Sequence, residues 1–149
     1  MRILKIEQCP SLSGNSRLTY HVGCSDQGDI YFRLQDNTAS GYFSKEWISF
    51  VHMEPMLSAE KITSGSLKPL FSGKSVNSSG FLFAVLIHEG LVERMPQSRS
   101  FVRSTDPGKF FLAIKALIEL DVSLDATQTP TPPKPVKTIK KDKPIKEAS

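Results

Sequence analysis

The chain has 149 residues, of which 39% are hydrophobic and 9% aromatic, so it can bury the core of one domain of ordinary size or of two small ones. It contains no apolar run of about 18 residues, which excludes a membrane-spanning helix. Its start, MRILKIEQCP, is interrupted by charge too early for a signal peptide. We therefore expect a cytoplasmic protein.

The formal net charge of +4 is concentrated at the end of the chain. Residues 1–125 carry thirteen basic and thirteen acidic side chains, whereas residues 126–149 carry six lysines against two acids. The overall charge is therefore weak support for nucleic-acid binding by the folded body. Within the body, residues 73–115 carry a local surplus of three positive charges.

The first third of the sequence predicts β-strands. Residues 1–10 and 30–34 are β-prone, and residues 17–24 alternate with period two, as in a half-buried strand. Residues 25–29 form a turn between the second and third strands. The two cysteines, Cys9 and Cys24, are too few for a disulfide framework, and two small buried thiols are favoured over a facing pair.

Residues 41–47 hold three aromatics, Tyr42, Phe43 and Trp47. The alternation of residues 47–52 favours a fourth strand over a short helix capped by Ser44. We expect residues 1–54 to form a small antiparallel β-rich unit that is marginal alone and packs on the second half. A junction is expected at residues 54–58.

Residues 58–79 predict helix only weakly. Two short segments, 58–62 and 67–71, have helical character, and Pro69 suits only a first turn. Residues 72–75, SGKS, imitate the end of a nucleotide-binding P-loop, but the glycine required earlier in that motif is replaced by Lys68. A nucleotide site is therefore not expected.

The stretch that organises the chain runs over residues 78–103. Serines precede an apolar block at residues 81–87, and Gly90 suits the left-handed position that ends a helix. Residues 91–94 and 100–103 predict a β-hairpin around the turn 95–99, and residues 107–120 show the apolar periodicity of another helix.

The passage LIHEGLVERMPQSRSFVRS resembles the step from the third helix to the wing in winged-helix transcription regulators. With its flanking residues the resemblance covers about a third of the chain, and it implies a winged-helix-like unit over residues 58–122. Such a unit also implies DNA binding and a role in transcription regulation, although many winged helices bind proteins instead.

The helix at residues 81–87 is apolar all round, so we expect it to lie in the core and not to read base edges. Contacts to phosphates are then expected from the helix N-terminus and from the wing. The candidate residues are Lys74, Asn77, Ser78, Ser79, Arg94, Gln97, Arg99 and Arg103.

Residues 126–149 are rich in Thr, Pro and Lys, which predicts a disordered basic tail whose lysines, Lys140 and Lys141 among them, meet phosphates. The three histidines lack metal-ligand spacing, and neither a cofactor nor a catalytic triad is indicated. The sequence thus predicts an α+β, non-enzymatic nucleic-acid-binding accessory protein. The alternative is a protein-interaction module that docks through the N-terminal sheet and the Tyr42, Phe43 and Trp47 cluster.

Overall fold

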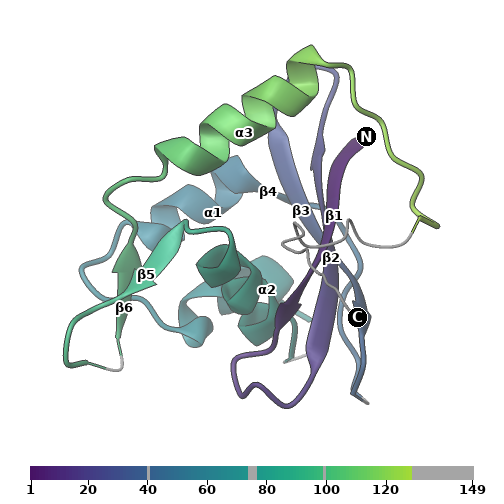
Figure 1. Ribbon diagram of the computed structural model, residues 1–149. Coiled ribbons are helices and arrows are strands. Elements are labelled where there is room, and N and C mark those ends of the chain that lie inside the picture. The colour runs from purple at the N-terminus through teal and green to yellow at the C-terminus, as the bar shows by residue number, and fades with distance from the viewer. Residues whose placement is uncertain (40, 74–76, 99, 129–149) are drawn as a thin grey trace, which may run out of the picture.

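The computed structural model describes residues 1–39, 41–73, 77–98 and 100–128. The fold is α+β, as expected, with an antiparallel four-stranded sheet followed by helices (Figure 1). The sheet has the order β1 (Arg2–Pro10), β2 (Arg17–Cys24), β3 (Ile30–Asn37) and β4 (Ile48–Ser49). The remaining elements are α1 (Phe50–Leu57), η1 (Ser64–Phe71), α2 (Asn77–His88), β5 (Val92–Arg94), β6 (Phe101–Arg103) and α3 (Gly108–Glu119).

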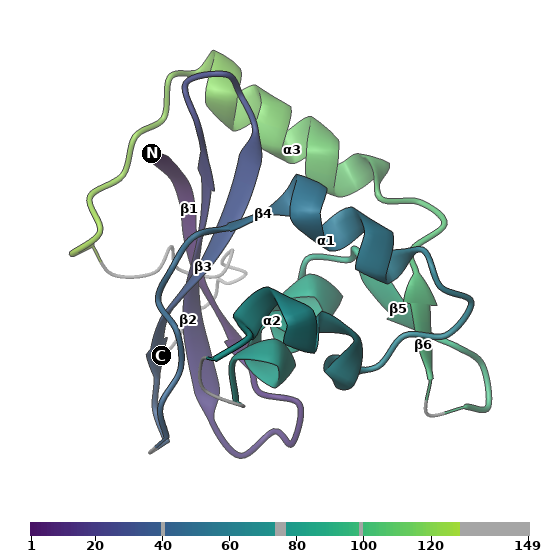
Figure 2. The ribbon, with the colours of Figure 1, turned by 180° about the vertical axis from the view of Figure 1, so that it is seen from behind.

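The two faces of the sheet have different surroundings. Tyr20 and Val22 of β2 lie opposite Leu34 and Phe32 of β3, and all four are buried core residues. Since side chains alternate along a strand, the residues between them face the other way. Figures 1 and 2 show α1, α2 and the β5–β6 hairpin on the core side of the sheet and α3 across one end.

One cluster of buried side chains joins the two halves of the chain. It takes residues from the sheet, from α1, η1 and α2, and from the hairpin and α3. Phe110 of α3 stacks on Phe32 with ring centroids 5.8 Å apart, and Phe111 meets the edge of Phe50 at 5.6 Å. The N-terminal sheet therefore packs on the second half, as its small size demands.

The fourth strand is much shorter than predicted, because helix replaces most of it. Only residues 48–49 pair with β3, and α1 begins at Phe50 and continues through the expected junction at residues 54–58. Phe50, Met53 and Leu57 are its buried residues, a helical spacing. The period-two pattern over residues 47–52 spans too few residues to reveal the helical spacing.

The helix and hairpin of the second half are present as predicted. Gly90 follows α2 with φ +78°, the left-handed conformation that ends a helix without strain on a Cβ. The β5 and β6 strands pair antiparallel beyond it. Of the two weakly predicted helical segments before α2, residues 67–71 lie in a 3₁₀ helix, η1, which buries Leu67 and Phe71. Residues 58–62 are not helical, and Ile62 instead pairs with Phe101.

The structure also bears on the predictions for the cysteines, for membrane-spanning helices and for the tail. Cys9 and Cys24 are buried free thiols at opposite ends of the β1–β2 pair, so they do not face each other. Of the helices in the described ranges, none has the length and apolar content needed to cross a membrane. Apart from residues 126–128, the predicted tail lies outside the described residues.

Candidate nucleic-acid interface

The base of the β5–β6 hairpin is built into the core. Phe101 exchanges two backbone hydrogen bonds with Ile62, at 2.7 and 3.0 Å between nitrogen and oxygen. Its ring also meets the edge of Phe83 in α2, with centroids 5.1 Å apart. The hairpin is therefore held on one side by the segment between α1 and η1, and on the other by α2.

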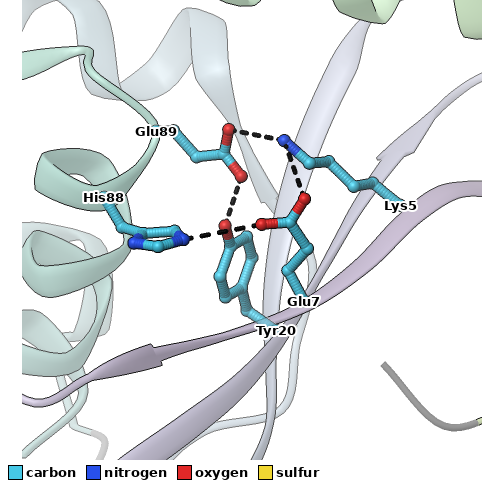
Figure 3. A network of polar contacts seen from close by, with 5 residues as sticks. All are labelled: Lys5, Glu7, Tyr20, His88 and Glu89. Carbon is cyan, nitrogen blue, oxygen red and sulfur yellow. Dashed lines mark hydrogen bonds and ion pairs between the residues drawn. The ribbon is translucent and has the colours of Figure 1, made fainter. Parts of the chain in front are cut away.

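A network of charged and polar side chains fixes the end of α2 just before the hairpin starts (Figure 3). The Glu89 side chain is only 5% exposed, and its carboxylate accepts a hydrogen bond from the Tyr20 hydroxyl. Lys5 Nζ lies 2.8 Å from the same carboxylate and 3.3 Å from Glu7. His88 Nε2 lies 3.5 Å from the other oxygen of Glu7.

The pKa shifts within this network favour a charged Lys5, a charged Glu7 and a protonated Tyr20. Burial lowers the pKa of Lys5, but the hydrogen bond and charge of Glu89, with those of Glu7, raise the pKa above its ordinary value. The hydrogen bond from His88 is the largest cause that lowers the pKa of Glu7. Burial and the nearby Glu89 raise the pKa of Tyr20, which keeps its hydroxyl protonated as a donor. The network thus clamps α2 to the sheet and sets where the hairpin begins.

The tip of the hairpin is exposed. Arg94 Nε donates a hydrogen bond to the Ser98 carbonyl oxygen at 3.0 Å, which fixes the plane of the guanidinium. Within the described ranges, the two terminal nitrogens of Arg94 make no hydrogen bond and no ion pair. Gln97 is exposed at the turn with φ +53°. The tip therefore offers an oriented guanidinium fork, which suits a phosphate.

Arg103 lies at the other end of β6 and is already paired. Its Nη2 is 2.9 Å from Glu54 Oε2 of α1, and both side chains are partly exposed. This ion pair connects the hairpin to α1 and neutralises the guanidinium. Arg103 therefore belongs to the packing of the hairpin base, and a phosphate would have to compete with Glu54 for it.

The N-terminus of α2 is more enclosed than the sequence suggested. Ser78 is fully buried, and its hydroxyl accepts a hydrogen bond from the Ser44 backbone N–H at 2.8 Å. Ser79 is also buried, whereas Asn77 is exposed and donates to the Tyr42 carbonyl at 3.1 Å. The two serines are thus part of the protein interior, and Asn77 stays at the surface.

A groove of about 450 Å³ with mixed polar and apolar walls opens beside this helix end. Its walls come from the β1–β2 loop, the end of β3, η1 and the first turns of α2. Asn15, Asn37 and Asn77 line it together with Lys68, an exposed cation that the sequence argument considered only as the residue replacing a P-loop glycine. Lys68 is a candidate contact because η1 places it at this groove, a position that local sequence patterns do not predict.

Most of α2 is unavailable for contact with a ligand. Seven of its twelve residues are buried, including Leu82, Phe83 and Val85. The sheet lies against one side of α2 and η1 against another. The expectation that this helix belongs to the core is confirmed.

Four of the predicted phosphate contacts, Lys74, Arg99, Lys140 and Lys141, lie outside the described residues. No sequence pattern predicts the network of Lys5, Glu7, Tyr20, His88 and Glu89, because its members come from distant parts of the chain. Glu89 is 84 positions from Lys5 and 69 from Tyr20, and no local pattern joins them.

Among the residues that the structure describes, no group of His, Cys, Asp and Glu is arranged to hold a metal ion. Comparisons of the chain with protein-family models, with curated proteins and with solved structures find no match.

Proposed function

We propose that this protein binds nucleic acid, most readily DNA, without catalysing a reaction, through phosphate contacts from the hairpin tip and the basic tail. The observation that carries the proposal is Arg94, an exposed guanidinium oriented by Ser98 on a hairpin whose base is part of the core. A pre-oriented fork loses little freedom when it meets a phosphate. The lysines of residues 126–149 would add charge-driven contacts.

The order of elements supports a winged-helix-like unit with the hairpin as its wing. The chain order is α1, an isolated β-bridge residue at Ile62, η1, α2 and then the two hairpin strands, β5 and β6. Ile62 forms its bridge with Phe101 of β6. Since α2 is buried, reading of base edges by this helix is not part of the proposal. Binding would be dominated by contacts to the phosphate backbone of the nucleic acid and would not depend on its base sequence. Such binding suits an accessory or regulatory protein of the cytoplasm.

The proposal is tested by fluorescence anisotropy with a labelled random-sequence DNA duplex, starting at about 50 mM salt, where phosphate contacts are strong. Because each phosphate contact releases about one counterion, Arg94→Ala should reduce the slope of log affinity against log salt by about one. Deleting residues 126–149 should reduce it further, since six lysines are lost.

Lys115→Ala is the matched control, because Lys115 is an exposed cation on α3, outside the proposed interface. Its slope should stay at the wild-type value. Undetectable binding of wild-type protein at about 50 mM salt would overturn the proposal. So would equal losses for Arg94→Ala and Lys115→Ala, because binding would then follow net charge alone.

One observation favours protein docking as a second candidate function. Tyr42 is 88% exposed, an unusual placement for a large aromatic side chain. The other two aromatics of that surface are less available. Phe43 packs against Phe81 with ring centroids 5.9 Å apart, and Trp47 is half-buried and stacks on Arg33.

A further inference from the structure

A polar cluster with one cation, Arg33, lies on the face of the sheet opposite the helices. His21 of β2 and Arg33 of β3 are direct cross-strand neighbours. They alternate with Tyr20, Val22 and Phe32 of the core, so their side chains point to the outer face. His21 is fully buried and Arg33 is half-buried, so the cluster combines an enclosed imidazole with a partly accessible cation.

Trp47 covers this cluster from the segment that leads into β4. The Arg33 guanidinium carbon lies 4.3 Å from the centroid of the indole ring, a stacked cation–π contact. The ring reaches over Gly23, where a Cβ would lie only 2.8 Å from the indole Cη2 atom. The bare backbone at Gly23 therefore sets the position of the indole, and the indole in turn sets the plane of the guanidinium.

The cluster has hydrogen-bond donors without acceptors. Arg33 Nη2 lies 3.2 Å from His21 Nδ1. Since a guanidinium only donates, Nδ1 accepts and the imidazole proton lies on Nε2. His21 Nε2 and Arg33 Nε are two of the three buried polar side-chain atoms without a hydrogen-bond partner in the described residues, the third being Arg2 Nε. Among the described residues no carboxylate lies within ion-pair distance of Arg33. Buried donors without partners are rare in native proteins.

We propose that His21, Arg33 and Trp47 form a binding site for the phosphate group of a phosphodiester. The phosphate would pair with the half-buried guanidinium of Arg33, and its oxygens would accept hydrogen bonds from the two enclosed N–H groups once the Trp47 ring moves aside. Its single negative charge would balance the single guanidinium. A phosphodiester carries one negative charge, whereas inorganic phosphate carries more at neutral pH. None of these three residues belongs to the hairpin, so this site can be tested independently of the proposed interface at Arg94.

The protonation of His21 agrees with a neutral donor. Burial first, and then the charge of Arg33, lower the pKa of His21 to about 4. The imidazole is therefore uncharged at neutral pH and adds a donor without a second positive charge. A bound phosphate would offset the effect of Arg33 and raise this pKa, which gives an independent readout by NMR titration of the ring.

The test uses the full-length protein and its intrinsic fluorescence, because Trp47 is the only tryptophan in the chain. Dimethyl phosphate is the phosphodiester probe, inorganic phosphate is the comparison, and sodium chloride holds ionic strength constant. We expect a saturable change in Trp47 emission with dimethyl phosphate, with a dissociation constant of about 1–10 mM, and an upward shift of the His21 titration midpoint. Arg33→Lys, which keeps the charge but removes the fork, should weaken binding about tenfold, and Lys115→Ala should leave it unchanged.

The wild-type titration decides the proposal even if Arg33→Lys disturbs the fold. A change in emission that does not saturate, or that sodium chloride reproduces, overturns the site. Binding of inorganic phosphate more than about tenfold tighter than dimethyl phosphate overturns the phosphodiester as its ligand. Since the readout is local to Trp47, DNA binding through Arg94 can fail while this site is supported, and the reverse can also occur.

Discussion

Two polar clusters lie on opposite faces of the same sheet, and they differ in how their charges are satisfied. On the core side, the buried carboxylate of Glu89 has both a cation, Lys5, and a hydroxyl donor, Tyr20. On the outer side, Arg33 has an aromatic ring and a neutral imidazole, but no acid among the described residues. Tyr20 and its sequence neighbour His21 thus belong to clusters of different kinds.

Whether a buried polar group has its hydrogen-bond partners distinguishes a structural role from a role in ligand binding. A buried ion pair with all its hydrogen bonds made adds little net stability, but it fixes one arrangement of the elements it joins. A buried donor without an acceptor is unfavourable in the free protein, and such groups concentrate at functional sites. The core-side cluster therefore accounts for how α2 is placed, and the outer cluster forms the phosphodiester site that we propose.

Removal of the core-side acid, Glu89, should have the largest effect on stability. Glu89→Ala leaves the Tyr20 hydroxyl buried without its acceptor and Lys5 without its closest partner. Since Lys5 is 22% exposed and can turn toward water, we expect a loss of about 2 to 3 kcal/mol in the free energy of unfolding. Urea denaturation monitored by circular dichroism measures it.

Glu54→Ala is the matched control for that loss. It removes the same carboxylate from an ion pair with Arg103, but there the side chains are 42% and 37% exposed. Exposed pairs contribute under about 1 kcal/mol, so the effect should be several times smaller. Equal effects of the two substitutions would mean that Glu89 has no special structural role.

A substitution at Gly23 tests whether the Trp47 ring of the outer cluster is packed tightly against the sheet. In Gly23→Ala the new methyl group would meet the indole of Trp47 at 2.8 Å and the Arg2 carbonyl oxygen at 2.9 Å. Such overpacking should cost about 1 to 2 kcal/mol and shift the emission of Trp47. Gly80→Ala is the control, since the nearest atom to its Cβ is 3.9 Å away and a helix favours alanine. An unchanged emission spectrum in Gly23→Ala would show that the indole is not held in this place.

The smallest effect is a pH dependence from Glu7. Its pKa is lowered in the folded protein, so it stabilises the fold above its ordinary pKa of 4.5, and this contribution is lost as pH falls through the folded value. Between pH 6 and 3, wild-type protein should therefore lose more stability than Glu7→Gln, by under about 1 kcal/mol because the group is half-buried. Urea denaturation at each pH measures the difference, and parallel pH profiles would contradict the assignment.

The sequence predicted the elements whose patterns are local. The alternation of residues 17–24, the apolar block before Gly90 and the hairpin after it all correspond to observed elements. It missed α1, because Phe50, Met53 and Leu57 extend beyond the short window that suggested a strand. Among the candidate contacts it named Arg94 and Gln97, which are exposed, together with Ser78 and Ser79, which the fold buries.

Local patterns in the chain are enough to predict an apolar helix and a short hairpin after a β-rich start, because helix ends, turns and strand alternation depend on neighbouring residues. Which polar side chains find partners depends instead on how the elements pack in three dimensions. Arg103 is paired and Arg33 lacks an acid among the described residues because of where α1 and the outer face of the sheet lie. Hydrogen bonds and ion pairs act over a few ångströms in space, whatever the distance along the chain.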